Sequence, residues 1–443
     1  MKKLFKLVLA VALMPVMLNA QGIVFEKGSF NEALNKAKKE NKLLFIDGYA
    51  VWCAPCKRME KTVFTEENVA SFVNEHMVSL KVDVEHGEGP KIKNKYRIHS
   101  LPGFVFLNGD GEVVYRITSS MEAEEFLEEA KTAVEFKNDP NSIGRLAERY
   151  DEKKNDEAYL KLYLDKLLAA KVPNYVDVLE QYLSIQTTID VSSKDMVYFL
   201  ADHMSQIVVG GQADNIIDNN IKTEAWKKYV RKDIRAKYLK LPKQMVERTT
   251  EYAIQKRDTT KLELALTEAQ SSGLIVGDIK DHRKRVYTYY YLNVGEGEAY
   301  KNLVHDDNVA LIESIDQEGL RESYLALKKR IEGGDVMAKG IIHHSTKFSG
   351  QIMDMAKKYA RFAKSEEEQA EVLSWIKVAN YIKPEDAFVL RDYANILYKF
   401  GKKEEALSFM ADAAKFAKEA DSKRAVSIIT DYEDMKAEAK LSL

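Results

Sequence analysis

The pattern of hydrophobic residues changes once along the chain, and this change limits the folds open to it. Before residue 138, short apolar runs of strand length alternate with stretches that have the period of a helix. Beyond the polar segment 138–142 the two-residue period of strands disappears, and residues 143–443 show helical spacing almost throughout. We therefore expect an α/β domain over residues 21–137, with a mixed central sheet and helices on both faces. A large all-α region is expected over residues 138–443.

The composition is that of an ordinary folded protein. Hydrophobic residues make up 45% and charged residues 31% of the 443 positions, which excludes a fully disordered chain. The 67 basic and 69 acidic residues give a formal net charge of -2, so charge provides no reason for nucleic acid to be the main partner. Only two cysteines are present, which rules out a disulfide-rich scaffold.

Residues 1–20 have the pattern of a secretory signal peptide. Three lysines in the first six positions form a basic start, residues 7–18 are apolar, and Ala20 is a small residue at the expected cleavage point. The alternative is a membrane anchor, but the apolar run is shorter than the roughly 20 residues that span a bilayer. We therefore expect an exported protein, periplasmic or secreted, with no stable membrane insertion after cleavage.

The α/β domain is expected to follow the order helix, strand, helix, helix, strand, connector, β-hairpin, helix. Ser29 and Glu32 have capping-box spacing at the start of the first helix, and Thr65 is expected to cap the third. The turn residues 108–111 separate the two strands of the hairpin. The expected helices are residues 30–39, 53–63, 66–76 and 121–134, and the expected strands are residues 43–47, 78–84, 104–107 and 113–117.

A weak internal repeat lies near the C-terminal end. The sequence Arg-Phe-Ala-Lys at residues 361–364 recurs as Lys-Phe-Gly-Lys at residues 399–402. Small residues around the second copy stand where two antiparallel helices would touch. This pattern resembles tetratricopeptide-type helical hairpins, which we expect near residues 352–420.

The motif Trp52-Cys53-Ala54-Pro55-Cys56 is the candidate active site of the sequence. It follows an expected strand and stands at the start of an expected helix. The reactive form of cysteine is the thiolate, and the ordinary pKa of the thiol is about 8.5. Unpaired N–H groups at the start of a helix favour negative charge on Cys53. Cys56, one turn later, is expected to be buried and to attack the mixed disulfide that Cys53 forms. Pro55 stiffens the pair at a position that needs no hydrogen bond.

The same two cysteines have no other partners in the chain. A bridge between Cys53 and Cys56 closes a very small loop, which constrains little of the unfolded chain. We therefore interpret the pair as a redox disulfide rather than a structural one. As the attacking group, Cys53 is expected to face solvent.

Two other positions fit this mechanism. Asp47 lies at the end of an expected strand, where burial would raise its pKa and let it take the proton from Cys56. The alternative is an aspartate that caps a turn. Pro102 precedes a strand, and a cis bond after Leu101 would expose the Leu101 backbone to an extended peptide. The alternative is an ordinary trans proline.

Residues 23–137 resemble the thioredoxin family, and are most similar to the C-terminal thioredoxin-like domain of the disulfide reductase DsbD and related exported proteins. The strand at residues 44–47, the motif at residues 52–57 and the dipeptide 101–102 match the family's motifs in order. The resemblance implies a thioredoxin fold and the following roles: Cys53 as nucleophile, Cys56 as resolving thiol, Asp47 as proton acceptor, Pro102 as the cis residue, and Trp52, Pro55, Leu101 and Pro102 in the substrate groove.

One departure from the family concerns the residue after the cis-proline. The family usually has threonine there, whereas this chain has Gly103. We expect the smaller residue to loosen the substrate groove and to alter substrate preference, while leaving the redox chemistry intact.

The expected function is thiol–disulfide exchange, without a cofactor or a bound metal. The dipeptide Ala54-Pro55 resembles that of reductants more than that of strong oxidants, so reduction or isomerisation of client disulfides is favoured over disulfide donation. A reductant in an oxidising compartment needs electrons, which implies a membrane thiol–disulfide reductase as partner. The helical region is expected to bind a disulfide-containing client protein or another partner.

Two other hypotheses stay open. In the first, the protein is a non-catalytic binding or assembly protein that uses the thioredoxin-like domain for docking, although binding alone needs neither thiol. In the second, it is a redox-sensing adaptor in which the bridge between Cys53 and Cys56 alters the affinity of the helical region.

Overall fold

The computed structural model describes most of the chain after the expected signal peptide. The predicted signal peptide and Trp52 lie outside the described residues. Two compact units are present, Met1–Gln186 and Thr187–Leu443, here called the first and the second unit. The described residues are 22–50, 53–85, 87–98, 100–117 and 119–419, with the short pieces 428–429, 431–433 and 435–436.

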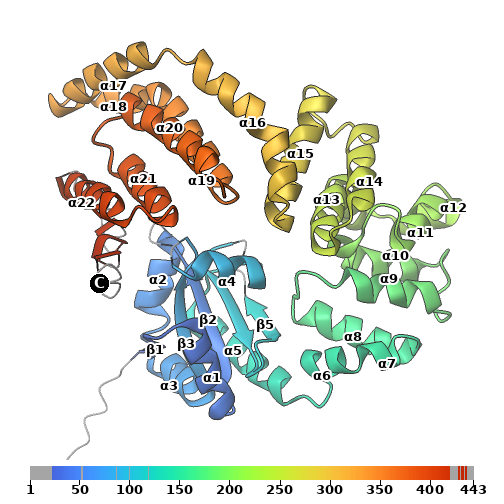
Figure 1. Ribbon diagram of the computed structural model, residues 1–443. Coiled ribbons are helices and arrows are strands. Elements are labelled where there is room, and N and C mark those ends of the chain that lie inside the picture. The colour runs from blue at the N-terminus through green and yellow to red at the C-terminus, as the bar shows by residue number, and fades with distance from the viewer. Residues whose placement is uncertain are drawn as a thin grey trace, which may run out of the picture. The chain divides into compact units, whose positions relative to one another are not determined.

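A five-stranded mixed sheet forms the centre of the first unit (Figure 1). The strand order is β1-β3-β2-β4-β5, in which β3 pairs in parallel with β1 and β2, while β4 is antiparallel to β2 and β5. The strands are β1 (Phe25–Glu26), β2 (Leu43–Tyr49), β3 (Met77–Asp83), β4 (Gly103–Leu107) and β5 (Val113–Ile117). The predicted mixed sheet is confirmed.

Helices cover both faces of this sheet, as predicted. Because successive strand residues point to opposite faces, β2 sends Phe45 to one side and Leu44 and Ile46 to the other. The side of Phe45 is covered by α2 (Ala54–Thr62), α3 (Glu67–His76) and α5 (Ala123–Asn138). The side of Leu44 is covered by α1 (Phe30–Lys39) and α4 (Gly89–Tyr96).

The local signals at helix starts were predicted with mixed success. The capping box at Ser29 is confirmed, since its hydroxyl accepts from the N–H of Glu32 and the Glu32 carboxylate accepts from the N–H of Ser29. The predicted cap at Thr65 is wrong, because α3 begins one residue later and the Thr65 hydroxyl instead donates to the carbonyl of Lys61. The short elements β1 and α4 were not predicted, since neither is long enough to show a clear period.

Four further helices belong to the first unit: α6 (Ile143–Glu148), α7 (Tyr150–Lys153), α8 (Glu157–Ala169) and α9 (Val176–Ile185). Helix α6 lies against β5 and α8. An ion pair between Lys166 and Asp139 ties α8 to the end of α5. The compact unit thus contains the sheet, its own helices and these four, and it extends to Gln186, beyond residue 137 where the sequence placed the end of the α/β domain. The domain at residues 21–137 stays a prediction.

The described part of the second unit is helical, which confirms the predicted all-α region. Sequence neighbours form pairs, α13 with α14, α17 with α18, α19 with α20, and α21 with α22. The helices are α10 (Lys194–Asp202), α11 (Gln212–Asn220), α12 (Glu224–Tyr229), α13 (Lys232–Lys256), α14 (Thr259–Ser271), α15 (Ile279–Val294), α16 (Gly297–Ser314), α17 (Gln317–Glu332), α18 (Val336–Ser345), α19 (Lys347–Ala360), α20 (Glu366–Ile382), α21 (Ala387–Lys399) and α22 (Lys403–Glu419), with a 3₁₀ turn at Met204–Gln206. Their assignment to tetratricopeptide-type repeats stays a prediction.

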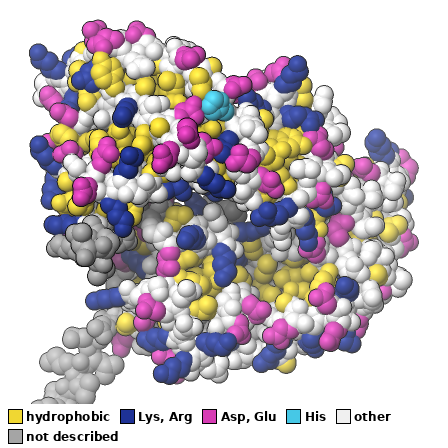
Figure 2. Space-filling view, viewed as in Figure 1, with side chains coloured by type: hydrophobic (Ala, Val, Ile, Leu, Met, Phe, Trp, Pro, Cys, Tyr) yellow, Lys and Arg dark blue, Asp and Glu magenta, His cyan; other side chains and the backbone are white. Residues whose placement is uncertain are grey.

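Charge is evenly distributed on the visible surface. Figure 2 shows Lys and Arg side chains interspersed with Asp and Glu over the face it presents, in keeping with the near-equal numbers in the sequence. Among the described residues, every helix is too short or too polar to cross a membrane.

The aromatic cluster around Phe45 generates a first prediction. The centre of its ring lies 5.1 to 6.1 Å from the ring centres of Phe64, Phe104, Phe106 and Phe126. We expect Phe45→Ala to lower the free energy of unfolding of the sheet by about 3–5 kcal/mol, through lost contacts and a cavity. Hydrogen exchange measured by mass spectrometry should show reduced protection in β2 and β4.

Phe348→Ala is the matched control for this change. Phe348 lies on α19 and is 36% exposed, so its loss is expected to cost about 1 kcal/mol or less. Equal loss of protection in β2 for both variants would contradict the central role of Phe45.

Candidate active site

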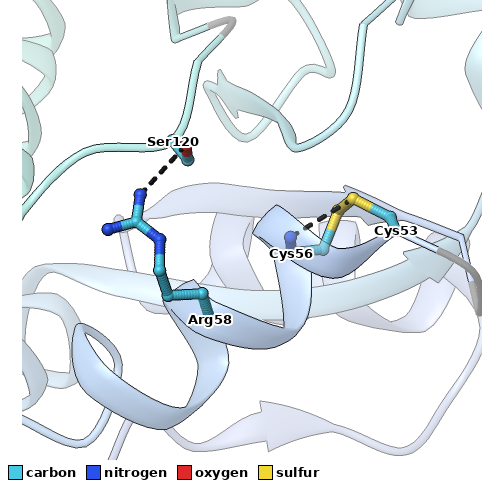
Figure 3. Close-up of a disulfide and its surroundings, with 4 residues drawn as sticks. All are labelled: Cys53, Cys56, Arg58 and Ser120. Carbon is cyan, nitrogen blue, oxygen red and sulfur yellow. Dashed lines mark hydrogen bonds between the residues drawn. A yellow bond between two sulfur atoms is a disulfide. The ribbon is translucent and has the colours of Figure 1, made fainter.

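The two cysteines lie at the start of helix α2. Cys53 is the N-cap residue, with an extended backbone, and Pro55 lies in the first turn, where a missing N–H costs no hydrogen bond. The Cys53 Sγ accepts a hydrogen bond from the backbone N–H of Cys56 at 3.2 Å. The pair forms a disulfide with a Cα–Cα distance of 5.4 Å, shown in Figure 3. The helix start therefore directs an N–H group at this sulfur, as the sequence predicted.

The predicted exposure of Cys53 is wrong for this disulfide form. Cys53 is 2% exposed and Cys56 is 6% exposed, so the expected contrast between an open attacker and a buried resolving thiol is absent. The physical reason is a small cluster in which Ala50, Tyr49 and Leu101 pack against the two cysteines. Tyr49 and Leu101 are themselves only partly buried. The disulfide thus packs directly against two side chains that reach the surface.

Asp47 lies inside β2, on the face that α2 covers. It is 3% exposed, and burial raises the pKa of its carboxyl to about 7, as the sequence predicted in direction. Lys81, its neighbour in the β2–β3 register, lowers this pKa, and Glu60 raises it. The alternative of a turn-capping aspartate does not fit, because β2 continues to Tyr49. The role of Asp47 as proton acceptor stays a prediction.

Lys81 also contacts two other side chains near this carboxyl. Its Nζ lies 2.6 Å from the carboxylate of Glu60 on α2 and 4.6 Å from the centre of the Tyr49 ring. The Glu60 carboxylate therefore neutralises part of the positive charge that faces Asp47. Lys81 and Glu60 were not predicted as site residues, although the strand and the helix that carry them were predicted.

The peptide bond between Leu101 and Pro102 is cis, which confirms that expectation and excludes the trans alternative. Pro102 stands immediately before β4, the antiparallel neighbour of β2, and Gly103 is opposite Gly48 in the register. Leu101 packs on the disulfide. The cis-proline loop therefore lies beside the two sulfurs, and the roles of Leu101 and Pro102 in substrate binding stay predictions.

Gly103 leaves a space that another residue fills. A Cβ atom at Gly103 would lie 2.5 Å from Cγ2 of Ile98 and 2.8 Å from the carbonyl oxygen of Ser100. At Gly48, a Cβ atom would lie 3.1 Å from Cδ1 of Ile98. Ile98 is 3% exposed, so its side chain occupies the space next to both glycines. The groove is therefore not loosened on this side, which corrects the expectation from Gly103 alone.

Sequence reasoning missed Ile98, although a signal for it existed. A glycine inside a strand often marks a close approach by another group. Here Gly48 and Gly103 face each other in neighbouring strands, and the two together indicate that something large lies over them.

Arg58 connects α2 to the segment before α5. Its guanidinium donates to the carboxylate of Glu122 at 2.6 Å and to the hydroxyl of Ser120 at 3.1 Å, and Figure 3 shows it pointing toward Ser120. These groups are exposed or partly exposed, so the ion pair contributes little to stability. A buried contact supports the same connection, because the Met121 N–H donates to the sulfur of Met59 at 3.3 Å. These contacts attach the middle of α2 to the segment before α5, in addition to the hydrogen bond at the N-terminal end of the helix.

No three His, Cys, Asp or Glu side chains are gathered closely enough to hold a metal ion in the part of the chain that the structure describes.

Comparison with known proteins agrees with this geometry. Residues 30–133 match the family described as thioredoxin-like domain. A thioredoxin of the H type from Fagopyrum esculentum is 34% identical over 95 residues, which cover 21% of this chain and 76% of that protein. The chain belongs to the thioredoxin family. Its thioredoxin-like domain carries the Cys53–Cys56 pair that a redox-active disulfide of this family requires.

Two further relatives of this thioredoxin-like domain are informative. The thiol:disulfide interchange protein DsbD of Pseudomonas fluorescens is 30% identical over 99 residues, which cover 22% of this chain and 17% of that protein. A "putative disulphide-isomerase" from Bacteroides thetaiotaomicron, known from a solution structure, has 47% sequence identity, covering 26% of this chain and 94% of that chain, with a TM-score of 0.25. For several curated relatives the chain spans less than two thirds of the relative's length.

The raised pKa of Asp47 predicts how stability depends on pH. The folded-state pKa of about 7 exceeds the ordinary value of 3.8, so the folded protein binds more protons than the unfolded chain between those values. Stability therefore falls as pH rises through this window. Between pH 5 and pH 8, we expect the free energy of unfolding of the wild type to fall by about 2–3 kcal/mol more than that of Asp47→Asn. Urea denaturation of both proteins at each pH measures this difference.

Asp151→Asn serves as the control for this measurement. The Asp151 side chain is 91% exposed, so its variant should follow the wild-type pH profile. Parallel profiles for Asp47→Asn and the wild type would show that Asp47 titrates normally.

The contact between Ile98 and Gly103 predicts non-additive effects. Gly103→Thr drives a side chain into Ile98 and should cost about 1–3 kcal/mol of stability. Ile98→Ala removes the side chain that occupies this space. The loss of unfolding free energy in the double variant should therefore be smaller than the sum of the two single losses by at least about 1 kcal/mol. Thermal and urea denaturation of the four proteins measures this coupling.

Ile92→Ala provides the matched control, because Ile92 is a buried isoleucine of the same core and lies on α4. Its combination with Gly103→Thr should be additive to within about 0.5 kcal/mol. Additivity for Ile98 as well would mean that the two residues do not compete for space.

Proposed function

We propose that this protein is an exported thiol–disulfide oxidoreductase that reduces or isomerises disulfides in client proteins through Cys53 and Cys56. The observation that carries the proposal is the placement of the disulfide at the start of α2, beside the cis Leu101–Pro102 bond. The same face of the sheet holds the buried carboxyl of Asp47. A purely structural bridge would require neither a cis-proline loop nor a buried acid.

In the reduced protein, the Cys53 thiolate attacks one sulfur of a client disulfide. A new bond joins Cys53 to the client, and the other client sulfur leaves as a thiolate. The N–H of Cys56 that points at Cys53 in the disulfide form would stabilise the negative charge of the attacking sulfur.

Release of the client requires the second cysteine. Cys56 gives its proton to the carboxylate of Asp47 and attacks the Cys53 sulfur, which breaks the mixed disulfide. The client leaves with both sulfurs reduced, and two electrons have passed from the protein to the client. A carboxyl with a pKa of about 7 suits this step, since it both takes and returns a proton near neutral pH.

Renewed activity requires two electrons from outside. We propose that a membrane thiol–disulfide reductase supplies them, and that the helical region binds the client or this donor. Export rests on the signal-peptide pattern of residues 1–20. The likeness to a protein named for thiol:disulfide interchange supports the exchange chemistry.

A redox-sensing adaptor is the second candidate. The two cysteines pack against the partly buried side chains of Tyr49 and Leu101, so opening or closing the disulfide would alter contacts of side chains that reach the surface. Rapid exchange with a protein disulfide would reject this candidate, and so would equal partner affinity of the reduced and oxidised protein.

Insulin reduction with dithiothreitol as electron donor tests the proposed enzyme. Cys53→Ser should lower the rate at least about hundredfold, because the attacking sulfur is lost. Cys56→Ser should instead accumulate a mixed disulfide between Cys53 and the client, since the resolving thiol is gone. Mass spectrometry of that adduct, isolated from the producing cell, identifies the client.

Lys61→Ser is the control, because Lys61 lies on the exposed side of the same helix. Its rate should match the wild type. If Cys53→Ser kept the wild-type rate, Cys53 would not be the nucleophile.

A further inference from the structure

A cavity of about 740 Å³ lies in the second unit, lined by α15, α16 and the C-terminal end of α19, which can be followed in Figure 1. One face of α15 lines it from Asp281 to Asn293, at the three- and four-residue spacing of a helix. Such a volume is in the range that holds a small organic ligand or a few residues of a peptide.

Positive charge exceeds negative charge around this cavity. Four cationic side chains line it, against the two carboxylates of Asp281 and Asp307. The cations are Lys284, Arg285, Lys358 and Arg361. An anion that enters the cavity therefore meets a net positive environment.

The two lysines are already paired, and the two arginines are not. Lys284 lies 2.5 Å from Asp307, and Lys358 lies 2.6 Å from Asp354. Arg361 donates to the carbonyl oxygen of Leu292, and Arg285 has no ion pair within the described residues. Two guanidinium groups thus line the cavity without a carboxylate partner.

The uncharged part of the lining contains apolar and aromatic side chains and one unsatisfied polar group. Leu292 and Val304, each 8% exposed, line the cavity together with Tyr289, which is 53% exposed. Asn308 is 9% exposed, and its amide nitrogen has no hydrogen-bond partner among the described residues. An unpaired buried donor is unfavourable, and a ligand oxygen would supply the missing partner after rotation of the amide.

These features favour a carboxylate over a phosphate. Phosphate sites commonly use free backbone N–H groups at a helix start, whereas most of this lining lies inside helices or at the end of α19. Asp281, in the first turn of α15, would repel a doubly charged group. A planar guanidinium matches the two oxygens of a carboxylate.

We propose that this cavity binds a carboxylate attached to an aromatic or aliphatic body. Arg285 and Arg361 hold the carboxylate, while Leu292, Val304 and Tyr289 surround the body. The carboxylate comes either from an acidic residue beside an apolar residue in a client or partner peptide, or from a small organic acid. The inference deepens the proposed function by naming what the helical region binds, and it uses no redox step.

Methyl NMR of the full-length protein tests this proposal, with the methyl groups of Leu292 and Val304 as reporters. The small probes are phenylacetate and phenylacetamide, and the peptide probes are acetyl-Glu-Phe-amide and acetyl-Gln-Phe-amide. Each carboxylate should shift both reporters and bind at least tenfold more tightly than its amide twin. Tighter binding of the acidic peptide than of phenylacetate indicates a peptide ligand, and the reverse indicates a small acid.

Two variants and a matched control complete the experiment. Arg285→Gln and Arg361→Gln should each weaken carboxylate binding at least tenfold. Lys280→Gln should leave it unchanged, since Lys280 lies on α15 outside the cavity lining. The proposal is overturned if the reporters do not respond to about 10 mM of either carboxylate. Equal binding of carboxylate and amide, or equal binding by Arg285→Gln and Lys280→Gln, would also overturn it.

Insulin reduction by the wild type and by Lys280→Gln separates this inference from the proposed function. Both proteins keep the cysteines and the cavity lining, so both should reduce insulin at the same rate. Loss of carboxylate binding in the arginine variants, together with insulin reduction by the wild type, supports both proposals. An NMR failure with intact reductase activity would remove only the cavity proposal.

Discussion

The register of β2 between β3 and β4 is the constraint on which the active site depends. Both faces of β2 are buried, so its side chains cannot change sides without moving aromatic rings into the other core. Phe45 holds that register through contacts with aromatic side chains from β4 and from the helices. The same register places Asp47 on the face of α2 and Gly48 opposite Gly103. A slip of one residue would remove the acid from the site and close the space that Ile98 fills.

The burial of the disulfide changes how the site must work. The two cysteines pack against Tyr49 and Leu101, whose side chains are only partly buried. Leu101 belongs to the cis-proline loop, so a client bound along this loop, as we propose, would contact a residue that packs on the disulfide. The side chain of Ile98 occupies the space next to Gly103, the residue that follows Pro102 of this loop. Under the proposed function, the residues that contact the client and those that pack on the sulfurs would thus be partly the same.

Most of the fold and the chemical centre could be predicted from the sequence, because both rest on local patterns. The capping box at Ser29, the strand that carries Asp47 and the helix after Cys53 are each encoded within a few positions. The exposure of Cys53 and the role of Ile98 could not be predicted in this way. Both depend on side chains that come from distant segments and meet only after the sheet has formed.

The pKa of Asp47 shows how opposing effects set a useful value. Burial alone favours the neutral acid, and an unpaired ammonium group beside it would restore ionisation and leave a weak base. Lys81 lies next to Asp47 in the register, but its charge is shared with Glu60 at 2.6 Å. The attraction is therefore reduced, and the carboxyl keeps a pKa of about 7. Glu60 lies on α2, the helix that begins at the cysteines. This helix therefore also affects the pKa of Asp47, the group proposed to accept the proton of Cys56.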